Sequence, residues 1–176
     1  MALIIRRATI EDAEAIARVD LDSHIAVYRP LRGDAYLADA TPESATEHWH
    51  RLLSSPASNV EVPREVLVAE DHRGVLGYSA LGASRDAGAG AVGEVFSIYL
   101  HPSVWRRGIG SRLLKAATDR LHEFGYTEIT LWVLDANEAA RAFYAAQGWQ
   151  PDGATEQSRG APGINLRYRA PPHTAD

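Results

Sequence analysis

The stretch V-F-S-I-Y-L-H-P-S-V-W-R-R-G-I-G-S-R-L-L, residues 95–114, joins a predicted strand to a predicted helix through a loop that holds two glycines. Pro102 stops the strand after His101, because proline has no N–H to give to a sheet. Gly108 and Gly110 fall at the first turn of the helix, where the missing Cβ lets backbone N–H groups approach a ligand closely. Since free N–H groups and the helix dipole favour negative charge, this unit predicts an anion site.

The residues of the loop indicate that the anion is a phosphate or a pyrophosphate. Arg106 and Arg107 stand beside the glycines and add positive charge. A Walker-type loop would need a lysine that is absent here, and the dinucleotide fingerprint fails where Leu113 replaces its third glycine. The alternative is that both glycines serve only the close packing of the helix against the strand.

A second stretch, N-E-A-A-R-A-F-Y-A-A-Q-G-W at residues 137–149, predicts a helix that Asn137 caps and Gly148 ends. Phe143 fits core packing, and Tyr144 lies about 100° further round the helix, so its phenol can face another direction. A tyrosine hydroxyl placed at a reacting group can donate a proton. The alternatives are that Tyr144 is a packing residue and that Asn137 is only a helix cap.

The rest of the chain predicts an α/β layered sheet of mixed direction. A capping box at residues 9–12 opens a first helix whose apolar positions end at Val19, and residues 21–40 follow no clear pattern. Predicted strands cover residues 3–7, 65–70, 75–83, 93–100, 127–134 and 164–169, and further helices cover residues 41–53, 110–124 and 137–147.

Composition excludes several classes of protein. The 176 residues suit one domain, and no apolar run approaches the roughly 18 residues that a membrane span needs. There is no cysteine, so disulfides, thiolate metal sites and a cysteine nucleophile are excluded, and we expect no metal. Lys+Arg 18 against Asp+Glu 23 gives a net charge of -5, which argues against nucleic acid and anionic membranes as partners. The start of the chain does not read as a signal peptide, so we expect a cytoplasmic protein.

Together the two stretches resemble the GNAT superfamily of N-acyltransferases. Its loop signature is Q/R-x-x-G-x-G/A, which residues 105–110 match except that Trp105 stands where the family has Gln or Arg. Its later motif reads roughly N-x-x-A-x-x-F-Y-x-x-x-G-F, which residues 137–149 match with Trp149 in place of Phe. The resemblance implies a mixed sheet of about seven strands flanked by about four helices. It implies one acetyltransferase domain over residues 1–170, with residues 171–176 as a flexible tail.

The resemblance also implies how acetyl-CoA is held. In the family, the strands corresponding to residues 94–100 and 127–134 splay apart, aided by a bulge, and the unpaired backbone receives the pantetheine arm. A main-chain N–H near Leu100 would polarise the thioester carbonyl. The expected cofactor-binding residues are Ile98, Tyr99, Leu100, Arg106, Arg107, Gly108, Ile109, Gly110, Ser111 and Asn137.

For catalysis, the resemblance implies that Tyr144 protonates the departing thiolate of coenzyme A. Glu94 is the candidate base for the incoming ammonium, directly or through water, and the alternative is a solvated carboxylate at a strand end. Asp and Tyr side chains within residues 20–39 would suit a cationic amine: Asp20, Asp22, Tyr28, Asp34, Tyr36 and Asp39. The alternative is that each is an ordinary surface residue.

The expected activity is direct acetyl transfer to a primary amine, without a covalent enzyme intermediate. The acceptor is a small molecule or a peptide, and a homodimer is possible because family members often dimerise. Two other readings stay open. One is a catalytically inactive acyl-CoA sensor or scaffold; the other is a phosphate-ligand or nucleic-acid binder that uses residues 105–107.

Overall fold

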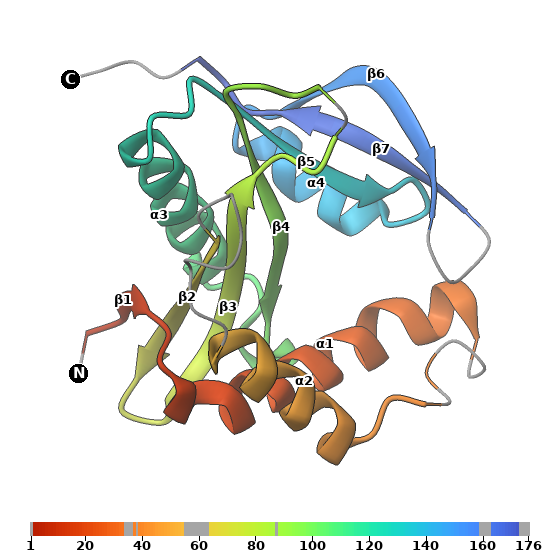
Figure 1. The fold of residues 1–176 in the computed structure, drawn as a ribbon. Coiled ribbons are helices and arrows are strands. Elements are labelled where there is room, and N and C mark those ends of the chain that lie inside the picture. Colours follow the sequence, from red (N-terminus) through yellow and green to blue (C-terminus); the bar gives the residue numbers. More distant parts are fainter. Residues whose placement is uncertain are drawn as a thin grey trace.

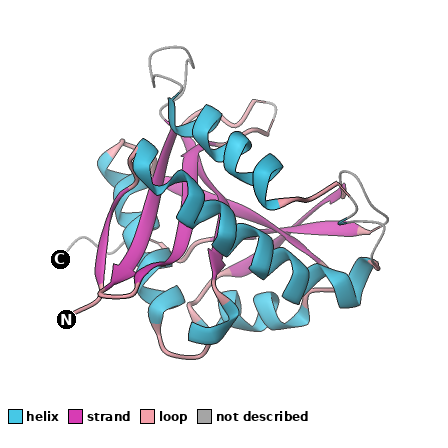
Figure 2. Cartoon of the chain, turned by 90° about the horizontal axis from the view of Figure 1, so that it is seen from below, coloured by secondary structure: helices cyan, strands magenta, loops and turns pink. Residues whose placement is uncertain are grey.

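The chain folds into one seven-stranded sheet with helices on both faces (Figures 1 and 2). The computed structural model describes residues 2–33, 37, 39–54, 64–86, 88–158 and 163–172. Its strands are β1 (Ile4–Arg7), β2 (Arg64–Asp71), β3 (Gly74–Ala83), β4 (Val92–Leu100), β5 (Glu128–Leu134), β6 (Gln150–Gln157) and β7 (Ile164–Arg169). Its α-helices are α1 (Ala13–Arg32), α2 (Pro42–Ser54), α3 (Ile109–Glu123) and α4 (Glu138–Ala146). The α/β class and the mixed seven-stranded sheet with four helices are therefore confirmed.

The sheet order is β1-β2-β3-β4-β5-β7-β6, and the only parallel neighbours in this described sheet are β4 and β5. Parallel strands need a crossover connection, and α3 supplies it here. Two hydrophobic cores fill the two faces. One joins α3 and α4 to the sheet, with Leu113, Leu121 and Tyr144 among its residues. The other joins α1 and α2 to β2 and β3, with Ile16 and Trp49 among its residues.

The first helix is longer than the apolar pattern predicts. Residues 21–32, which follow no apolar period, continue α1 to Arg32 with Pro30 in its last turn. Gly33 ends the helix at φ 77°, a conformation that glycine adopts without strain, and its N–H bonds to the Arg29 carbonyl at 3.0 Å. At this end the Arg32 Nη2 donates to Ser158 Oγ at 2.5 Å, so α1 reaches from β3 to the end of β6.

The local sequence pattern did not indicate β6. Its sequence, Q-P-D-G-A-T-E-Q, is polar and almost wholly exposed, and it pairs only with β7. The register shifts between Pro151 and Thr155, around Gly153 at φ 90°. An edge strand with proline and glycine has no apolar alternation to detect, because neither of its faces lies on a core. Of the expected tail, residues 173–176 lie outside the described residues.

Candidate active site

The two central strands separate halfway along their length. Pairing between β4 and β5 runs from Val92 with Glu128 to Val95 with Leu131 and stops there. Beyond that point β5 pairs with β7 alone, and β4 pairs with β3 alone. A register shift opposite Ala80 and Leu81 places a bulge in β4 at Phe96, where the separation begins. Both the splay and the bulge that the sequence resemblance implied are present, and they leave one main-chain edge of residues 96–100 without a strand partner.

The glycine loop, residues 105–110, lies just after the open end of β4. Arg106 at φ 63° and Gly108 at φ 76° both take left-handed backbone conformations, which turn successive N–H groups toward one side. The first helical bond runs from the Arg112 N–H to the Gly108 carbonyl at 3.3 Å, so the N–H groups of residues 109–111 precede the helical hydrogen-bond ladder. Arg106 and Arg107 are exposed beside them. Free N–H groups and arginines at a helix N-terminus are suited to an anion.

Trp105, the residue that departs from the family pattern, ties this loop to the strand. Its indole Nε1 donates to the Leu100 carbonyl at 2.7 Å although the residue is 40% exposed. The same carbonyl accepts a hydrogen bond from Ser23 Oγ on α1, also at 2.7 Å. One carbonyl at the open end of β4 therefore connects the loop, the strand and the first helix.

Gly110 joins the two sequence motifs. A Cβ at this position would lie 3.3 Å from Leu100 Cδ1 and 3.3 Å from the ring of Phe143 on α4. The glycine therefore has a packing role as well as its place among the free N–H groups. From the sequence these two roles were alternatives. The structure shows that Gly110 does pack closely against Leu100 and Phe143.

The helix α4 places Tyr144 against the core. Asn137 caps the helix by accepting the Ala140 N–H at 3.1 Å, so its capping role is confirmed. Tyr144 is 8% exposed, and burial, with a smaller contribution from the phenol of Tyr28, raises its pKa above the ordinary value. Its hydroxyl makes no hydrogen bond to any residue that the structure describes. The phenol thus stays protonated and has its O–H available.

Three phenols from three elements meet at the opening. Tyr28 on α1 and Tyr99 on β4 share a hydrogen bond between their hydroxyls at 3.0 Å. Tyr144 on α4 interacts electrostatically with both. Tyr28 belongs to the α1 layer and Tyr144 to the α3 and α4 layer. Side chains from the two faces of the sheet therefore interact at the gap between β4 and β5.

A carboxylate and a histidine lie on the same side of α1 as Tyr28. Asp20 accepts hydrogen bonds from the Tyr78 hydroxyl and from the Trp49 indole Nε1, the latter at 3.4 Å. The His24 Nδ1 lies 2.9 Å from the Asp20 carbonyl and 3.2 Å from its Oδ1. The ring of His24 packs on Tyr99, with centroids 4.6 Å apart, and on Tyr28 at 5.1 Å.

Asp20 and His24 each stabilise the charged form of the other. Burial opposes ionisation of Asp20, but hydrogen bonds and the charge of His24 outweigh it and lower the pKa of Asp20. Burial would likewise lower the pKa of His24, and the hydrogen bonds and charge of Asp20 raise it instead. Sequence analysis identified Asp20 and Tyr28 as candidates and missed His24. The available signal was that His24 lies four residues from each of them, after the apolar period of the helix stops. Asp34 and Tyr36 lie outside the described residues.

Glu94 lies at the closed end of β4, opposite Thr130 of β5. Its side chain is 0% exposed. One carboxylate oxygen accepts the Arg85 backbone N–H at 2.9 Å, and the other accepts the Arg85 guanidinium. That guanidinium packs over the ring of Phe96 at 4.6 Å. A direct base would have to reach the acceptor amine, whereas both oxygens of Glu94 are already engaged by Arg85.

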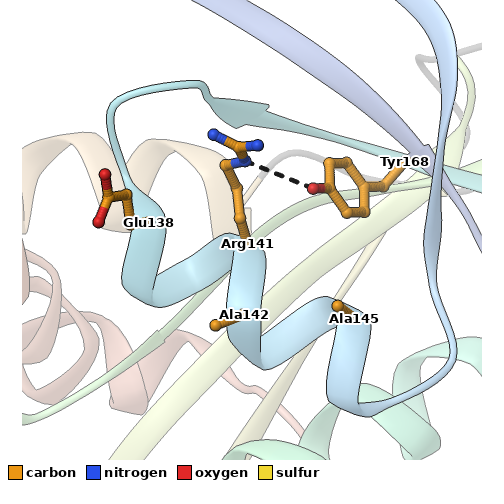
Figure 3. A pocket seen from close by; sticks show the side chains of 5 residues that line it. All are labelled: Glu138, Arg141, Ala142, Ala145 and Tyr168. Atoms are coloured by element: carbon orange, nitrogen blue, oxygen red, sulfur yellow. Dashed lines mark hydrogen bonds between the residues drawn. The ribbon is translucent and has the colours of Figure 1, made fainter.

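A separate shallow pocket lies on another face of α4 (Figure 3). It is lined by Glu138, Arg141, Ala142, Ala145 and Tyr168. Arg141 extends toward Tyr168, with Nε 3.5 Å from the phenol oxygen, and its Nη1 bonds to Asp135. Neither Tyr144 nor the glycine loop lines this pocket, so it is distinct from the opening between β4 and β5.

Among the described residues, no three His, Asp or Glu side chains gather as ligands for a metal ion. None of the helices in that part of the chain combines the length and apolar character that crossing a bilayer requires.

Comparisons with known proteins identify the family. Residues 26–149 match the model of the acetyltransferase (GNAT) family. An uncharacterized N-acetyltransferase of Bacillus subtilis, YuaI, is 28% identical over 165 residues, which cover 93% of this chain and 88% of that protein. The PaiA N-acetyltransferase of Thermoplasma acidophilum, solved with coenzyme A, superposes with a TM-score of 0.74 at 23% identity, covering 94% and 98% of the two chains.

A second solved structure, YncA of Salmonella typhimurium with acetyl-CoA, gives a TM-score of 0.70 at 18% identity, over 100% of this chain and 98% of that one. At such identities the structural likeness shows the fold, and the family model and the sequence relative add the activity class. Taken with the splayed strands, the glycine loop and the tyrosine of α4, these findings show that the chain belongs to the GNAT family and is an N-acetyltransferase.

Proposed function

We propose that this enzyme transfers an acetyl group from acetyl-CoA to a primary amine by direct attack, without a covalent enzyme intermediate. The observation that carries the proposal is the end of β4–β5 pairing at Val95 and Leu131, with the glycine loop and Tyr144 at the open end. A strand edge, an anion site and a proton donor are thereby grouped where a long ligand with a phosphate end and a thioester end can lie.

The residues present fit coenzyme A. The N–H groups of residues 109–111 and the exposed Arg106 and Arg107 suit its pyrophosphate. The unpaired edge at Ile98, Tyr99 and Leu100 suits the amides of its pantetheine arm, because unpaired main-chain groups need partners. PaiA and YncA, which share the fold, were solved with coenzyme A and acetyl-CoA. When bound, acetyl-CoA supplies the acetyl group and a thiol leaving group.

Tyr144 acts in this proposal as the general acid. Its raised pKa keeps the phenol protonated at neutral pH, and its hydroxyl makes no other bond to the described residues. It can therefore give its proton to the sulfur as the C–S bond breaks. A main-chain N–H near Leu100 would stabilise the negative charge on the carbonyl oxygen.

Glu94 acts indirectly in this proposal. Its ion pair with Arg85 fixes the start of β4 and the connection that precedes it, two residues before the bulge at Phe96. Any proton exchange between Glu94 and the acceptor would pass through water. Because both oxygens are engaged, we assign Glu94 first to holding the geometry of the opening.

The acceptor in this proposal is a cationic amine, on a small molecule or a peptide. The chain carries a net charge of -5, which favours a cationic ligand over an anionic one. At the opening itself the aromatic rings of Tyr28 and Tyr99 provide surfaces that an ammonium group prefers, and Asp20 adds negative charge behind them.

The first test is thermal unfolding with and without acetyl-CoA. A ligand at 100 times its dissociation constant stabilises the folded state by about 2.7 kcal/mol, which raises the midpoint by several degrees. Release of coenzyme A with a panel of primary amines can then be followed with a thiol reagent, because the chain contains no cysteine. Binding with turnover supports the proposal. Binding without turnover of any amine overturns it in favour of an acyl-CoA sensor.

A further inference from the structure

The polar face of α1 carries chemistry that the acetyl-CoA site does not use. Asp20, His24 and Tyr28 are spaced four residues apart, so they form one row along the helix. This row lies over the opening, because Tyr28 bonds to Tyr99 of β4 and His24 packs on the Tyr99 ring. It therefore faces the place where an acceptor amine would meet the thioester.

The hydrogen bonds of His24 define which nitrogen is basic. Nδ1 lies within bonding distance of two acceptors, the Asp20 carbonyl at 2.9 Å and the Asp20 carboxylate at 3.2 Å. Nδ1 must therefore carry the hydrogen, so in the neutral ring Nε2 carries the lone pair. No described residue bonds to Nε2, and the side chain remains 25% exposed. A ligand in the opening can reach this nitrogen.

Asp20 is itself held firmly, which fixes the ring of His24. The Tyr78 hydroxyl and the Trp49 indole bond its two oxygens from β3 and α2. A histidine whose Nδ1–H is held by an anchored carboxylate is the arrangement that orients an imidazole and stabilises the cation it becomes. His101, which follows Leu100, also lies beside a carboxylate, with its Nε2 3.2 Å from Asp22, but the Asp22 side chain is 42% exposed and the His101 Nδ1 lies against Ser103 instead. His24 is the described histidine whose Nδ1 faces a partly buried, anchored carboxylate.

His24 and Tyr144 approach the opening from opposite layers. Tyr144 belongs to the core of α3 and α4, and His24 stands on α1 with Tyr28 and Tyr99 between them. In acyl transfer the amine attacks the carbonyl carbon from one side and the thiolate departs on another. A base on the α1 side and an acid on the α4 side match these two needs, whereas Glu94 has both oxygens engaged by Arg85.

We propose that His24, oriented by Asp20, is the general base that removes the proton from the acceptor ammonium. Nε2 takes one proton from R–NH3⁺; the amine nitrogen then forms the C–N bond as the C–S bond breaks, and the Tyr144 hydroxyl gives its proton to the sulfur. The second proton lost by the nitrogen restores the Tyr144 hydroxyl, and His24 releases its proton to solvent. This inference rests on the proposed acetyl transfer to an amine.

The groups around His24 set the pH range of this step. Burial and Arg32 on the same helix lower the pKa of His24, and Asp20 raises it by more. Tyr28 and Tyr99 pack on the ring, and burial raises the pKa values of Tyr99 and of Tyr78 behind Asp20, so these two phenols stay neutral. Below its pKa His24 already holds a proton and cannot accept one. The rate should therefore rise with pH through the pKa of His24, and the acid limb of kcat/KM should report that pKa.

The test measures kcat/KM against pH for the wild type and for His24→Gln, Asp20→Asn and His72→Gln, with an amine the wild type accepts. We expect His24→Gln to lose about 10²- to 10⁴-fold in kcat/KM and to lose the acid limb. His24→Ala, whose smaller side chain leaves space for imidazole, should recover part of the rate when imidazole is added. Asp20→Asn should move the acid limb to lower pH, because the charge that raises the His24 pKa is gone. His72→Gln, in the exposed β2–β3 turn, should match the wild type.

Acetyl-CoA affinity and the unfolding midpoint of each variant separate catalysis from folding. If His24→Gln binds acetyl-CoA as the wild type does and keeps the acid limb or the full rate, His24 is not the base and the inference is overturned while the proposed function stands. If the wild type binds acetyl-CoA but acetylates no amine, the proposed function fails, and the inference fails with it.

Discussion

The two ends of β4 differ in how the main-chain hydrogen bonds of this central strand are made. At Val92 to Val95 the strand is paired on both sides, and the carboxylate of Glu94 is sealed into the structure by Arg85. At Ile98 to Leu100 it is paired on one side only, and phenols, a histidine and a glycine loop gather around the open edge. The closed end stabilises the fold, and the open end provides the proposed site for acetyl-CoA.

Hydrogen bonds from other elements explain why the fold tolerates the separation of β4 from β5. An open strand edge exposes main-chain groups that need partners. Here the Leu100 carbonyl accepts bonds from Ser23 and Trp105, so part of that need is met without a neighbouring strand. The closed end and α1, which reaches across to Ser158, hold the two halves of the sheet in place while the gap stays open.

Removing the phenol oxygen of Tyr144 should have the largest effect of the changes in this comparison. Tyr144→Phe keeps the ring in the core but removes the proton for the thiolate, so we expect kcat to fall about 10²- to 10⁴-fold. Acetyl-CoA affinity should stay nearly unchanged. Tyr126→Phe is the matched control, because Tyr126 packs beside Gly93 at the closed end. A wild-type rate for Tyr144→Phe would remove its role as the acid.

Changing the glycine loop should act on binding. Gly108 is at φ 76°, where a side chain costs about 1–2 kcal/mol, so Gly108→Val should displace the loop and weaken acetyl-CoA binding about tenfold. Gly110→Val adds contacts against Leu100 and Phe143 and should weaken it further. Calorimetry measures both. Gly153→Val at φ 90° in β6 is the control, and equal losses there would mean that the effect is global.

At the closed end, Glu94→Gln should cost stability more than chemistry. The charged hydrogen bonds to Arg85 are lost in part, so we expect the free energy of unfolding, measured by denaturant titration, to fall by about 1–3 kcal/mol. Glu47→Gln, in an exposed pair with Arg51, should change little. The acid limb of the pH–rate profile should stay in place; its displacement in Glu94→Gln would restore Glu94 as the base.

We expect the smallest effect from loss of the hydrogen bond between Trp105 of the glycine loop and the Leu100 carbonyl of β4. Trp105→Phe removes the bond to the Leu100 carbonyl, and about 1 kcal/mol corresponds to a roughly fivefold weaker affinity for acetyl-CoA. Trp132→Phe removes a comparable indole bond, to Asp86, away from the loop. An unchanged affinity in Trp105→Phe would show that Ser23 alone fixes the end of β4.

Prediction from sequence succeeded where neighbouring residues carry the pattern. The strand at residues 93–100, the glycine loop and the helix that Asn137 caps all depend on contacts within a few residues, and each was predicted close to its observed bounds. It failed on the second half of α1, because the face that would show an apolar period instead carries Asp20, Ser23, His24 and Tyr28. It also failed on β6, whose strand character depends on pairing with β7.

Local backbone preferences and residue spacing were enough to predict the family, the order of most elements and the loop suited to a phosphate. The contents of the site depend instead on how distant parts of the chain pack together. The carboxylate of Glu94, which looked like a base, is engaged by Arg85, and His24, which belongs to no sequence motif, packs on the two phenols of Tyr28 and Tyr99. Burial and strand pairing arise between residues far apart in the chain, and no local pattern encodes which distant partner arrives.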